Sequence, residues 1–387
     1  MSNKFPNTAD VVVIGGGVIG LTCAYRLARE GLRVAIVERG QCGREASWAG
    51  AGVLQCGSWH RKDTIVQMQR ASLKMYPGFV SELVEHTGID PEYLPCGSYE
   101  MLLEEQQYQM ARSEVVAAEA FRSSYGGPVL EFLTPDDARQ IEPKLTHDML
   151  GVKVSHITCQ IRNPLLLQAL RIMCERERIK IIESCSVQRF VRSGERVAGV
   201  QTDAGTIEAG HVLLAAGSWS SLLDSELATT TPVYPVRGQI ILLEKQPRPF
   251  THIIEQGKCY MVPRLDGRIV IGATEEHDSG YDKRNTAEGV HHLLTLATRL
   301  VPPLAEATIL RTWAGLRPGT PDNKPYIGPV PGMDGLVAAT GHFRSGLILA
   351  PLTARIITDL IVRGQTDHDL TRFAPGRSET ETELTTS

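Results

Sequence analysis

The sequence predicts an α/β fold with two sheets, a parallel one built from both ends of the chain and an antiparallel one built from its middle. The first observation is a strand, glycine turn and helix over residues 10–30, followed by a strand that closes at Glu38. The second is the same order over residues 335–363, which returns the chain to the first sheet. The third is a series of alternating strands between residues 236 and 274, typical of an antiparallel sheet.

The first glycine turn, Gly15-Gly-Gly17-Val-Ile-Gly20, has the G-x-G-x-x-G spacing of a dinucleotide site. Gly15 permits the tight turn, Gly17 lets backbone N–H groups approach a pyrophosphate, and Gly20 lets the helix pack close to the strand. The helix N-terminus adds partial positive charge. Glu38 can accept hydrogen bonds from ribose hydroxyls and disfavours a 2′-phosphate, although the neighbouring Arg39 weakens that argument. The alternative is a glycine turn that serves packing alone.

The remaining elements follow from periodicity and from capping residues such as Thr134, which precedes Pro135 at a helix start. The expected helices cover residues 18–30, 64–87 with a break near Pro77-Gly78, 104–125, a short turn from 134, 163–178, 286–300 and the segment up to 363. The expected strands cover residues 186–191, 196–202, 211–215, 236–244, 258–263, 268–274, 310–316 and 335–340.

Composition limits the classes of function. The chain has 387 residues, 42% of them hydrophobic, and a formal net charge of −4, which favours neither nucleic acid nor an anionic membrane surface. Its eight cysteines are scattered without a C-x-x-C pair, so we expect free thiols. The polar N-terminus lacks the apolar core of a signal peptide, and no apolar run suggests a membrane span. These features predict a soluble, cytoplasmic protein.

Two further segments have the small residues that a flat ligand requires nearby. The segment from Gly43 to Gly52 is rich in alanine and glycine, and a strand ends at Ala216-Gly217. A flexible linker is the alternative for the first segment, but Trp48 argues against it. His291-His292 lies on a polar helix without matching ligands, so no metal site is expected.

Together these pieces resemble the FAD-dependent D-amino-acid oxidase superfamily, and most closely its glycine oxidase branch. Long stretches are similar to that branch, and the resemblance extends to about Phe373. The stretches are Tyr260-Met-Val-Pro-Arg264, Ile269-Val-Ile-Gly-Ala-Thr274, Trp313-Ala-Gly-Leu-Arg317-Pro-Gly-Thr-Pro-Asp-Asn-Lys-Pro-Tyr-Ile-Gly328 and Gly341-His-Phe-Arg344-Ser-Gly-Leu-Ile-Leu-Ala-Pro351.

The resemblance implies a Rossmann-type FAD-binding domain interleaved with a smaller antiparallel substrate domain. The implied FAD-binding domain covers residues 1–85, 150–225 and 326–373, and the substrate domain covers residues 86–149 and 226–325. Residues 374–387 are expected to form a disordered tail, because they are rich in Ser, Glu and Thr.

The resemblance also implies which residues contact FAD. The pyrophosphate would lie on the glycine turn with Val18 and Ile19, and the adenosine ribose would meet Glu38 and Arg39. Other implied contacts along the cofactor are Ala46, Ser47, Ala51, Gly52, Val53, Val187, Ala216, Gly217, His342, Phe343, Arg344, Ser345, Gly346, Leu347 and Ile348. No cysteine lies in the segment 314–319, where some relatives attach the flavin, so FAD is expected to bind non-covalently.

Three residues are implied at the substrate. The planar guanidinium of Arg317 would bind the substrate carboxylate through two hydrogen bonds, and Tyr260 would donate a further one. Arg344 would add a second positive charge, or alternatively orient its own loop. Without the resemblance, Arg317 would be interpreted as a structural ion-pair residue and Tyr260 as a core tyrosine. Lys258 stands where some glycine oxidases have histidine, which leaves the substrate preference open.

The implied activity is oxidation of glycine, sarcosine or a small D-amino acid to the imine, with O2 reduced to hydrogen peroxide. No general base is assigned. The glycine branch is linked to thiamine biosynthesis, where glycine imine feeds thiazole formation, and its members are often tetramers, so we expect a homo-oligomer. Two alternatives are a D-amino-acid dehydrogenase that passes electrons to a quinone and a non-catalytic FAD-binding or tRNA-modification protein.

Overall fold

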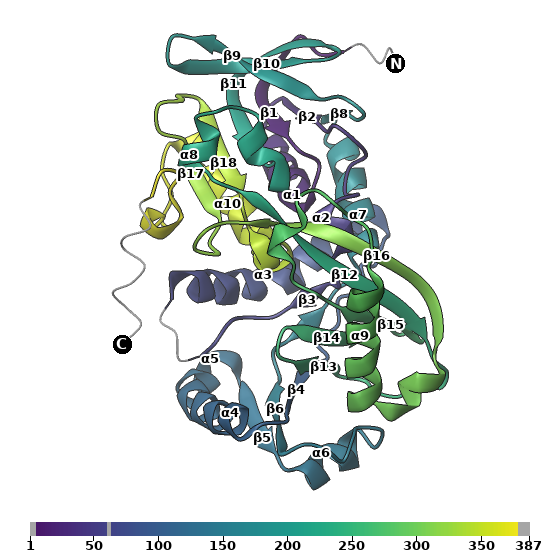
Figure 1. The fold of residues 1–387 in the computed structure, drawn as a ribbon. Helices are drawn as coiled ribbons and strands as arrows, with labels where there is room; N and C mark the ends of the chain where they lie inside the picture. Colours follow the sequence, from purple (N-terminus) through teal and green to yellow (C-terminus); the bar gives the residue numbers. More distant parts are fainter. Residues whose placement is uncertain (1–4, 60–62, 378–387) are drawn as a thin grey trace.

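Both ends of the chain contribute to the first sheet, as predicted. The computed structural model describes residues 5–59 and 63–377. The central strands of this sheet are parallel, and β17 pairs antiparallel at its edge. The order is β17 (Tyr326–Pro329), β18 (Leu336–Thr340), β11 (Gly205–Leu214), β1 (Thr8–Ile14), β2 (Val34–Val37) and β8 (Lys180–Ile182) (Figure 1). A hairpin of β9 (Val187–Ser193) and β10 (Arg196–Thr202) extends β11.

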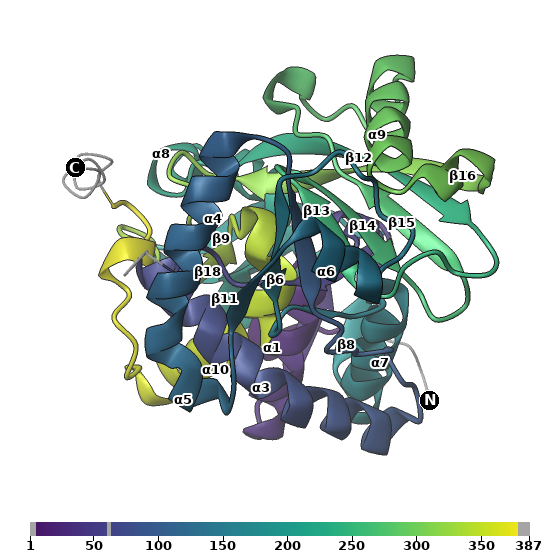
Figure 2. The same cartoon turned by 90° about the horizontal axis from the view of Figure 1, so that it is seen from below.

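Four helices pack against one another beside this sheet (Figure 2). They are α1 (Val18–Arg29), α3 (Thr64–Thr87), α7 (Asn163–Arg176) and α10 (Gly346–Arg363). By length and composition, one described segment, Phe343–Arg363, is apolar enough to cross a membrane, which corrects the expectation that none is. This segment includes α10, which contacts both α1 and α3, so packing in the core accounts for its apolar composition.

The second sheet is formed mainly from the middle of the chain. Its strands pair antiparallel except for β13 and β4, which are parallel. The order is β16 (Thr308–Gly319), β12 (Tyr234–Glu244), β15 (Arg268–Gly272), β14 (Cys259–Pro263), β13 (Ile253–Gln256), β4 (Ser98–Leu102), β6 (Gly151–Ser155) and β5 (Leu130–Leu133). The predicted fold class, a parallel-rich α/β part with an antiparallel-rich second part, is confirmed.

Shorter elements connect and cover the two sheets. The two-residue strands β3 (Val53–Leu54) and β7 (Cys159–Gln160) pair with each other. The remaining helices are α2 (Ala46–Ala49), α4 (Glu105–Ala118), α5 (Arg122–Tyr125), α6 (Pro135–Ile141), α8 (Leu227–Thr230) and α9 (Ala287–Leu300). Thr134 caps α6 by accepting a hydrogen bond from the Asp137 amide, as its sequence predicts.

The structure corrects four sequence-based expectations. Helix α3 continues through Pro77, because buried side chains on both sides of the proline, such as Tyr76 and Val80, pack into the core. Eight strands were not expected from the sequence: β3, β4, β5, β6, β7, β8, β13 and β17. Strand β6 pairs with β4 and β5, so the second sheet extends past the boundary placed at residue 150. Arg377 forms an ion pair with Asp322, so the ordered chain extends past residue 374, and residues 378–387 lie outside the described part.

The close contact between α1 and β1 leads to a testable prediction. A Cβ added to Gly20 would lie 2.0 Å from the Gly15 carbonyl oxygen, so Gly20→Ala must push α1 away from the strand. We expect a loss of about 1–3 kcal/mol in unfolding free energy, measured by denaturant titration. Gly78→Ala is the control, because its Cβ meets nothing within 4 Å in α3. That control should be neutral or slightly stabilising, and equal losses for both variants would contradict the prediction.

Candidate active site

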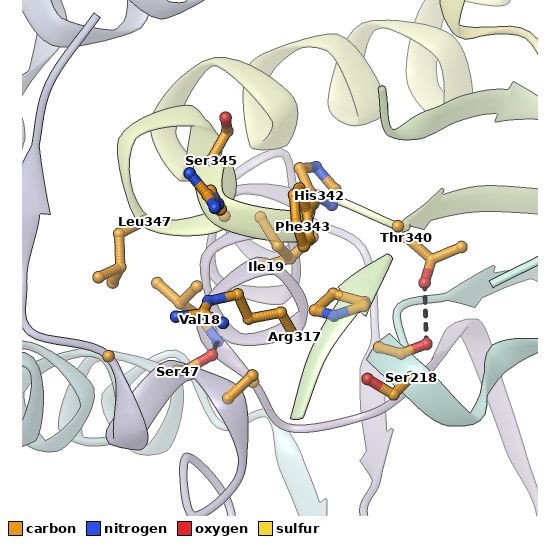
Figure 3. Close-up of a pocket in the computed structure, with 18 of the residues that line it drawn as sticks. Val18, Ile19, Ser47, Ser218, Arg317, Thr340, His342, Phe343, Ser345 and Leu347 are labelled. Atoms are coloured by element: carbon orange, nitrogen blue, oxygen red, sulfur yellow. Dashed lines mark hydrogen bonds between the residues drawn. The ribbon is translucent and has the colours of Figure 1, made fainter. Parts of the chain in front are cut away.

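A cavity of about 1150 Å³ lies between the two sheets. Figure 3 shows its wall where α1 begins, at Val18 and Ile19, and where the turn before α10 carries His342, Phe343 and Ser345. All predicted cofactor residues line this cavity except Gly20, whose role is the helix packing described above. The predicted substrate residues Arg317, Tyr260 and Arg344 line it as well.

The glycine turn after β1 forms one end of the cavity. Gly15 has a φ of +106°, and a Cβ there would lie 2.4 Å from the Ala215 carbonyl oxygen. The Val18 amide, at the start of α1, donates a hydrogen bond to the Ser47 hydroxyl (2.9 Å). The Glu38 carboxylate accepts hydrogen bonds from the amides of Gly16 and Gly40, both at 2.8 Å. A carboxylate has about four acceptor positions, so Glu38 retains capacity for a ribose hydroxyl.

A tryptophan that sequence reasoning missed lies at the same end. The Arg39 guanidinium stacks on the ring of Trp219 at 3.6 Å from its centroid. Trp219 follows Ala216-Gly217 and lines the cavity with Val187. The signal was present in the sequence, because Trp219 directly extends the segment whose glycine indicated a ligand.

The other end of the cavity contains the turn between β18 and α10. Gly341 has a φ of +71°, and a Cβ there would lie 2.4 Å from the Thr320 side chain. Ser345 accepts a hydrogen bond from the Gln69 amide group (2.9 Å), which ties the turn to α3. The cavity therefore has glycine turns and helix N-termini at both ends. Such a cavity fits a dinucleotide whose phosphates lie at α1 and whose flavin ring lies at α10.

Arg317 projects from β16 over a neighbouring glycine. A Cβ added to Gly238 on β12 would lie 2.5 Å from the guanidinium nitrogens, so only glycine leaves room for this position. One guanidinium nitrogen donates to the Thr274 carbonyl oxygen at 3.0 Å. In the described part of the chain, no carboxylate lies within ion-pair distance of Arg317. Its remaining N–H donors are available to a ligand.

Tyr260 lies against the Arg317 guanidinium. Burial raises the pKa of the Tyr260 hydroxyl, and the positive charges of Arg317 and Arg344 offset that effect only in part. The phenol therefore remains protonated at neutral pH and can donate a hydrogen bond. Arg317 and Tyr260 together form a donor pair suited to a carboxylate.

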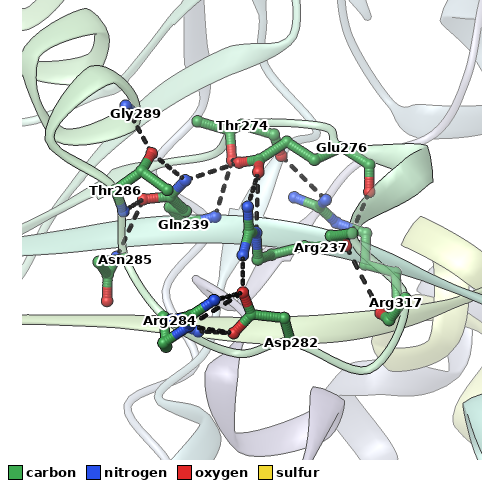
Figure 4. A network of polar contacts seen from close by, with 12 residues as sticks. Arg237, Gln239, Thr274, Glu276, Asp282, Arg284, Asn285, Thr286, Gly289 and Arg317 are labelled. Carbon is green, nitrogen blue, oxygen red and sulfur yellow. Dashed lines mark hydrogen bonds and ion pairs between the residues drawn. The ribbon is translucent and has the colours of Figure 1, made fainter.

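A polar network behind Arg317 fixes the segment that carries the Thr274 carbonyl (Figure 4). Arg237, which is 8% exposed, donates to Glu276 at 2.5 and 2.8 Å. Gln239 donates to the same carboxylate at 2.7 Å, and the Thr274 hydroxyl donates at 2.5 Å. Burial alone would raise the pKa of Glu276, but these hydrogen bonds and the Arg237 charge hold it below the ordinary value. The network keeps Glu276 ionised and the Thr274 carbonyl in place.

Arg344 reaches the cavity but is paired with an acid that sequence reasoning missed. Glu275, whose side chain is 9% exposed, forms ion pairs with Arg344 and with Lys258 (2.5 Å), and His277 lies 3.4 Å away. Three basic groups thus converge on one carboxylate. The predicted contact of Arg344 with substrate stays a prediction, and the observed pairing favours the alternative that Arg344 orients its loop.

His342 lies in the turn before α10 but cannot act as a cation there. The side chain is 3% exposed, and its Nε2 is 3.1 Å from the Thr353 hydroxyl. Burial lowers the pKa of His342 from 6.5 to about 3. The ring is therefore neutral at physiological pH, which agrees with a structural rather than a proton-transfer role.

The low pKa of His342 predicts acid sensitivity. Between pH 6.5 and about 3 the unfolded chain binds a proton that the folded chain excludes, so stability falls as the pH falls. At pH 5 the loss relative to pH 7.5 is about 2 kcal/mol. We expect His342→Asn to reduce this loss in denaturant titrations with saturating FAD at both pH values. The exposed His291→Asn is the control, and an identical pH dependence for all three proteins would contradict the assignment.

Comparisons with known proteins agree with this geometry. Residues 10–360 match the family model DAO, FAD dependent oxidoreductase. The chain is 38% identical to a glycine oxidase of Pseudomonas aeruginosa, covering 94% of this chain and 98% of that protein. It is 33% identical to the bifunctional protein ThiO/ThiG of Synechocystis sp., covering 97% of this chain and 55% of that longer protein.

The solved structures include a similar protein as well. The crystal structure of glycine oxidase from Geobacillus kaustophilus superimposes with a TM-score of 0.90 at 31% identity, covering 96% of this chain and 99% of that one. The sequence similarity and the structural similarity to glycine oxidases therefore both extend over nearly the full length of the chain. The chain belongs to the DAO family of FAD-dependent oxidoreductases and is glycine oxidase-like.

Proposed function

We propose that this protein oxidises glycine and other small amines or D-amino acids, such as sarcosine, D-alanine and D-proline. For glycine and D-alanine the product imine hydrolyses to a 2-oxo acid and ammonia, for sarcosine it hydrolyses to a 2-oxo acid and methylamine, and for D-proline the product is a cyclic imine. In each case O2 is reduced to hydrogen peroxide. The observation that carries the proposal is the Arg317 guanidinium, which faces the cavity beside Tyr260 without a carboxylate partner among the described residues. A free α-carboxylate supplies that partner.

The residues of the chain position the substrate. Arg317 binds the α-carboxylate through two N–H donors, and the Tyr260 hydroxyl donates a third hydrogen bond. This arrangement fixes the α-carbon relative to the turn before α10, which is the main contribution expected of the protein. Bound FAD supplies the hydride acceptor and the reaction with O2. The substrate amine loses its proton to solvent before oxidation, so no general base of the protein is assigned.

Non-covalent binding of FAD is part of the proposal. The segment 314–319 has no cysteine. Three cysteines line the cavity, Cys56, Cys185 and Cys259, and burial raises the pKa of each, that of Cys56 to about 12. Thiols in that state are poor nucleophiles. The similarity to ThiO/ThiG supports a role in supplying glycine imine for thiazole formation. A cytoplasmic location and a homo-oligomer, such as a tetramer, complete the proposal.

The activity is tested directly on the purified yellow protein. We expect hydrogen peroxide release with one or more of glycine, sarcosine, D-alanine and D-proline, measured with a coupled peroxidase. Dye reduction by these substrates without peroxide would overturn the oxidase proposal and favour a dehydrogenase. Absence of both peroxide and dye reduction would favour a non-catalytic FAD-binding protein.

The carboxylate clamp is tested by Arg317→Ala. Losing charge-assisted hydrogen bonds to the substrate should raise KM roughly 10- to 100-fold, while the flavin absorbance stays that of wild type. Arg311→Ala is the matched control, because Arg311 lies on the same strand and stacks on Trp48 at 5.0 Å from the ring centroid, outside the cavity. Equal KM values for wild type and Arg317→Ala would show that the carboxylate is bound elsewhere.

A further inference from the structure

The cavity that contains Arg317 and Tyr260 has further lining residues to which neither the cofactor nor the carboxylate clamp has been assigned. They include the segment Gln55–Ser58, and Ile65, Val66 and Gln69 at the start of α3. Glu255 on β13 belongs to the same lining. Because glycine has no side chain, it would offer these groups no partner. This part of the lining therefore points to a substrate with a polar side chain.

Glu255 is the nearest cross-strand neighbour of Tyr260. The two residues are directly opposite in the antiparallel pairing of β13 and β14, so their side chains lie on the same face of the sheet. Directly opposite residues have Cβ atoms about 4.5–5.5 Å apart. The Gln55 side-chain amide donates to both Glu255 oxygens, at 2.9 and 3.1 Å. This pairing orients the carboxyl group next to the carboxylate clamp.

Glu255 has no basic partner within ion-pair distance among the described residues. The positive charge of Lys153 acts on Glu255, but this lysine is already shared by Glu100 (2.6 Å) and Glu114. Burial and the negative charge of Glu100 raise the pKa of Glu255. The hydrogen bonds from Ser98 and Gln55 and the charge of Lys153 offset this only in part. Three carboxyl groups thus surround one lysine. A positive charge entering the cavity beside Glu255 would correct this imbalance.

The other charged groups at this end of the cavity do not compete for that role. Lys258, His277 and Arg344 all converge on Glu275, so each of them already has an acidic partner within the protein. An anionic side chain would find these basic groups engaged, and the Glu255 carboxyl group would offer it no positive charge. An apolar side chain would exclude water from Glu255 without replacing it by a partner. A cationic side chain is the one that the wall complements.

We propose that Glu255 binds a cationic group on the substrate side chain, so that the preferred substrate of this oxidase is a D-amino acid with a side-chain amine or guanidinium group. This inference rests on the proposed oxidase function and on the carboxylate clamp at Arg317. The α-carboxylate would bind Arg317 and Tyr260, while the side chain would extend toward Glu255 and Gln55. Glu255 is a specificity residue in this arrangement, and the reacting amine does not contact it.

The test compares substrates that differ in charge at equal chain length. D-ornithine and D-lysine are matched by D-norvaline and D-norleucine, and glycine and D-alanine serve as references. With the wild-type enzyme we expect kcat/KM for peroxide release to favour the basic member of each pair at least tenfold. Equal kcat/KM values for charged and uncharged members would overturn the inference. This comparison does not depend on any variant folding correctly.

Glu255→Gln identifies the residue responsible. The amide keeps the size of the side chain and its hydrogen bond with Gln55 but loses the charge. We expect the preference for D-ornithine over D-norvaline to fall roughly 10- to 100-fold, while kcat/KM for D-norvaline changes less than about threefold. Glu131→Gln is the matched control, because Glu131 lies on β5 of the same sheet but does not line the cavity. It should keep the wild-type preference.

Three outcomes separate this inference from alternatives. If Glu255→Gln lowers kcat for glycine and D-ornithine equally, Glu255 acts on the reacting amine and the inference is overturned. If glycine, D-alanine and D-norvaline are oxidised without preference for basic substrates, the inference fails and the proposed oxidase function stands. If none of the six substrates is oxidised, the proposed function fails and the inference fails with it.

Discussion

The site depends on the position of one guanidinium group that has no carboxylate partner within the described part of the protein. Arg317 lies over Gly238, where any side chain would collide with it, and the Thr274 carbonyl holds it from behind. Leaving a partly buried cation without a counter-charge costs free energy, which its packing and the hydrogen bond to Thr274 offset only in part. In the proposed function a substrate carboxylate completes the pairing, so the same geometry that costs stability would provide affinity. Arg317 lies on β16, which pairs with β12, and β12 pairs with β15 on its other side.

The charges of the cavity are arranged in two contrasting ways. Glu38, Glu275 and Arg344 are satisfied by groups of the protein itself, through backbone amides or through ion pairs. Arg317 and Glu255 have hydrogen bonds but no ion-pair partner among the described residues, and both lie next to Tyr260. Groups of the first kind shape the cavity, whereas groups of the second kind are available for a ligand. This difference separates the cofactor and framework residues from those that select the substrate.

Several features were predictable because the local chain determines them. The glycine turn at Gly15, the cap at Thr134 and the strand–turn–helix at Gly341 each depend on backbone conformations that a few residues specify. The resemblance to glycine oxidases then identified Arg317 and Tyr260, which the structure brings together. Local chemistry alone would have treated both as ordinary framework residues.

The missed features all depend on distant partners. Strand β13 is short and joins the sheet through β4 and β14, and β6 lies in the second sheet because β4 and β5 flank it, so neither is evident from its own residues. Glu275 and Glu255 have no motif around them. Their roles follow from which basic groups reach them, which only the packing of the strands decides.

The sequence by itself determined the two-sheet architecture, the dinucleotide turn and, through the resemblance, the cofactor class, because each is encoded in contiguous segments with strong backbone constraints. Only the tertiary structure decided which charges remain unpaired in the cavity. Whether a charge is compensated depends on groups far apart in the sequence, because Glu275 pairs with Arg344 and Lys258 whereas Arg317 has only the Thr274 carbonyl oxygen. The proposals for the substrate of this protein rest on that distinction.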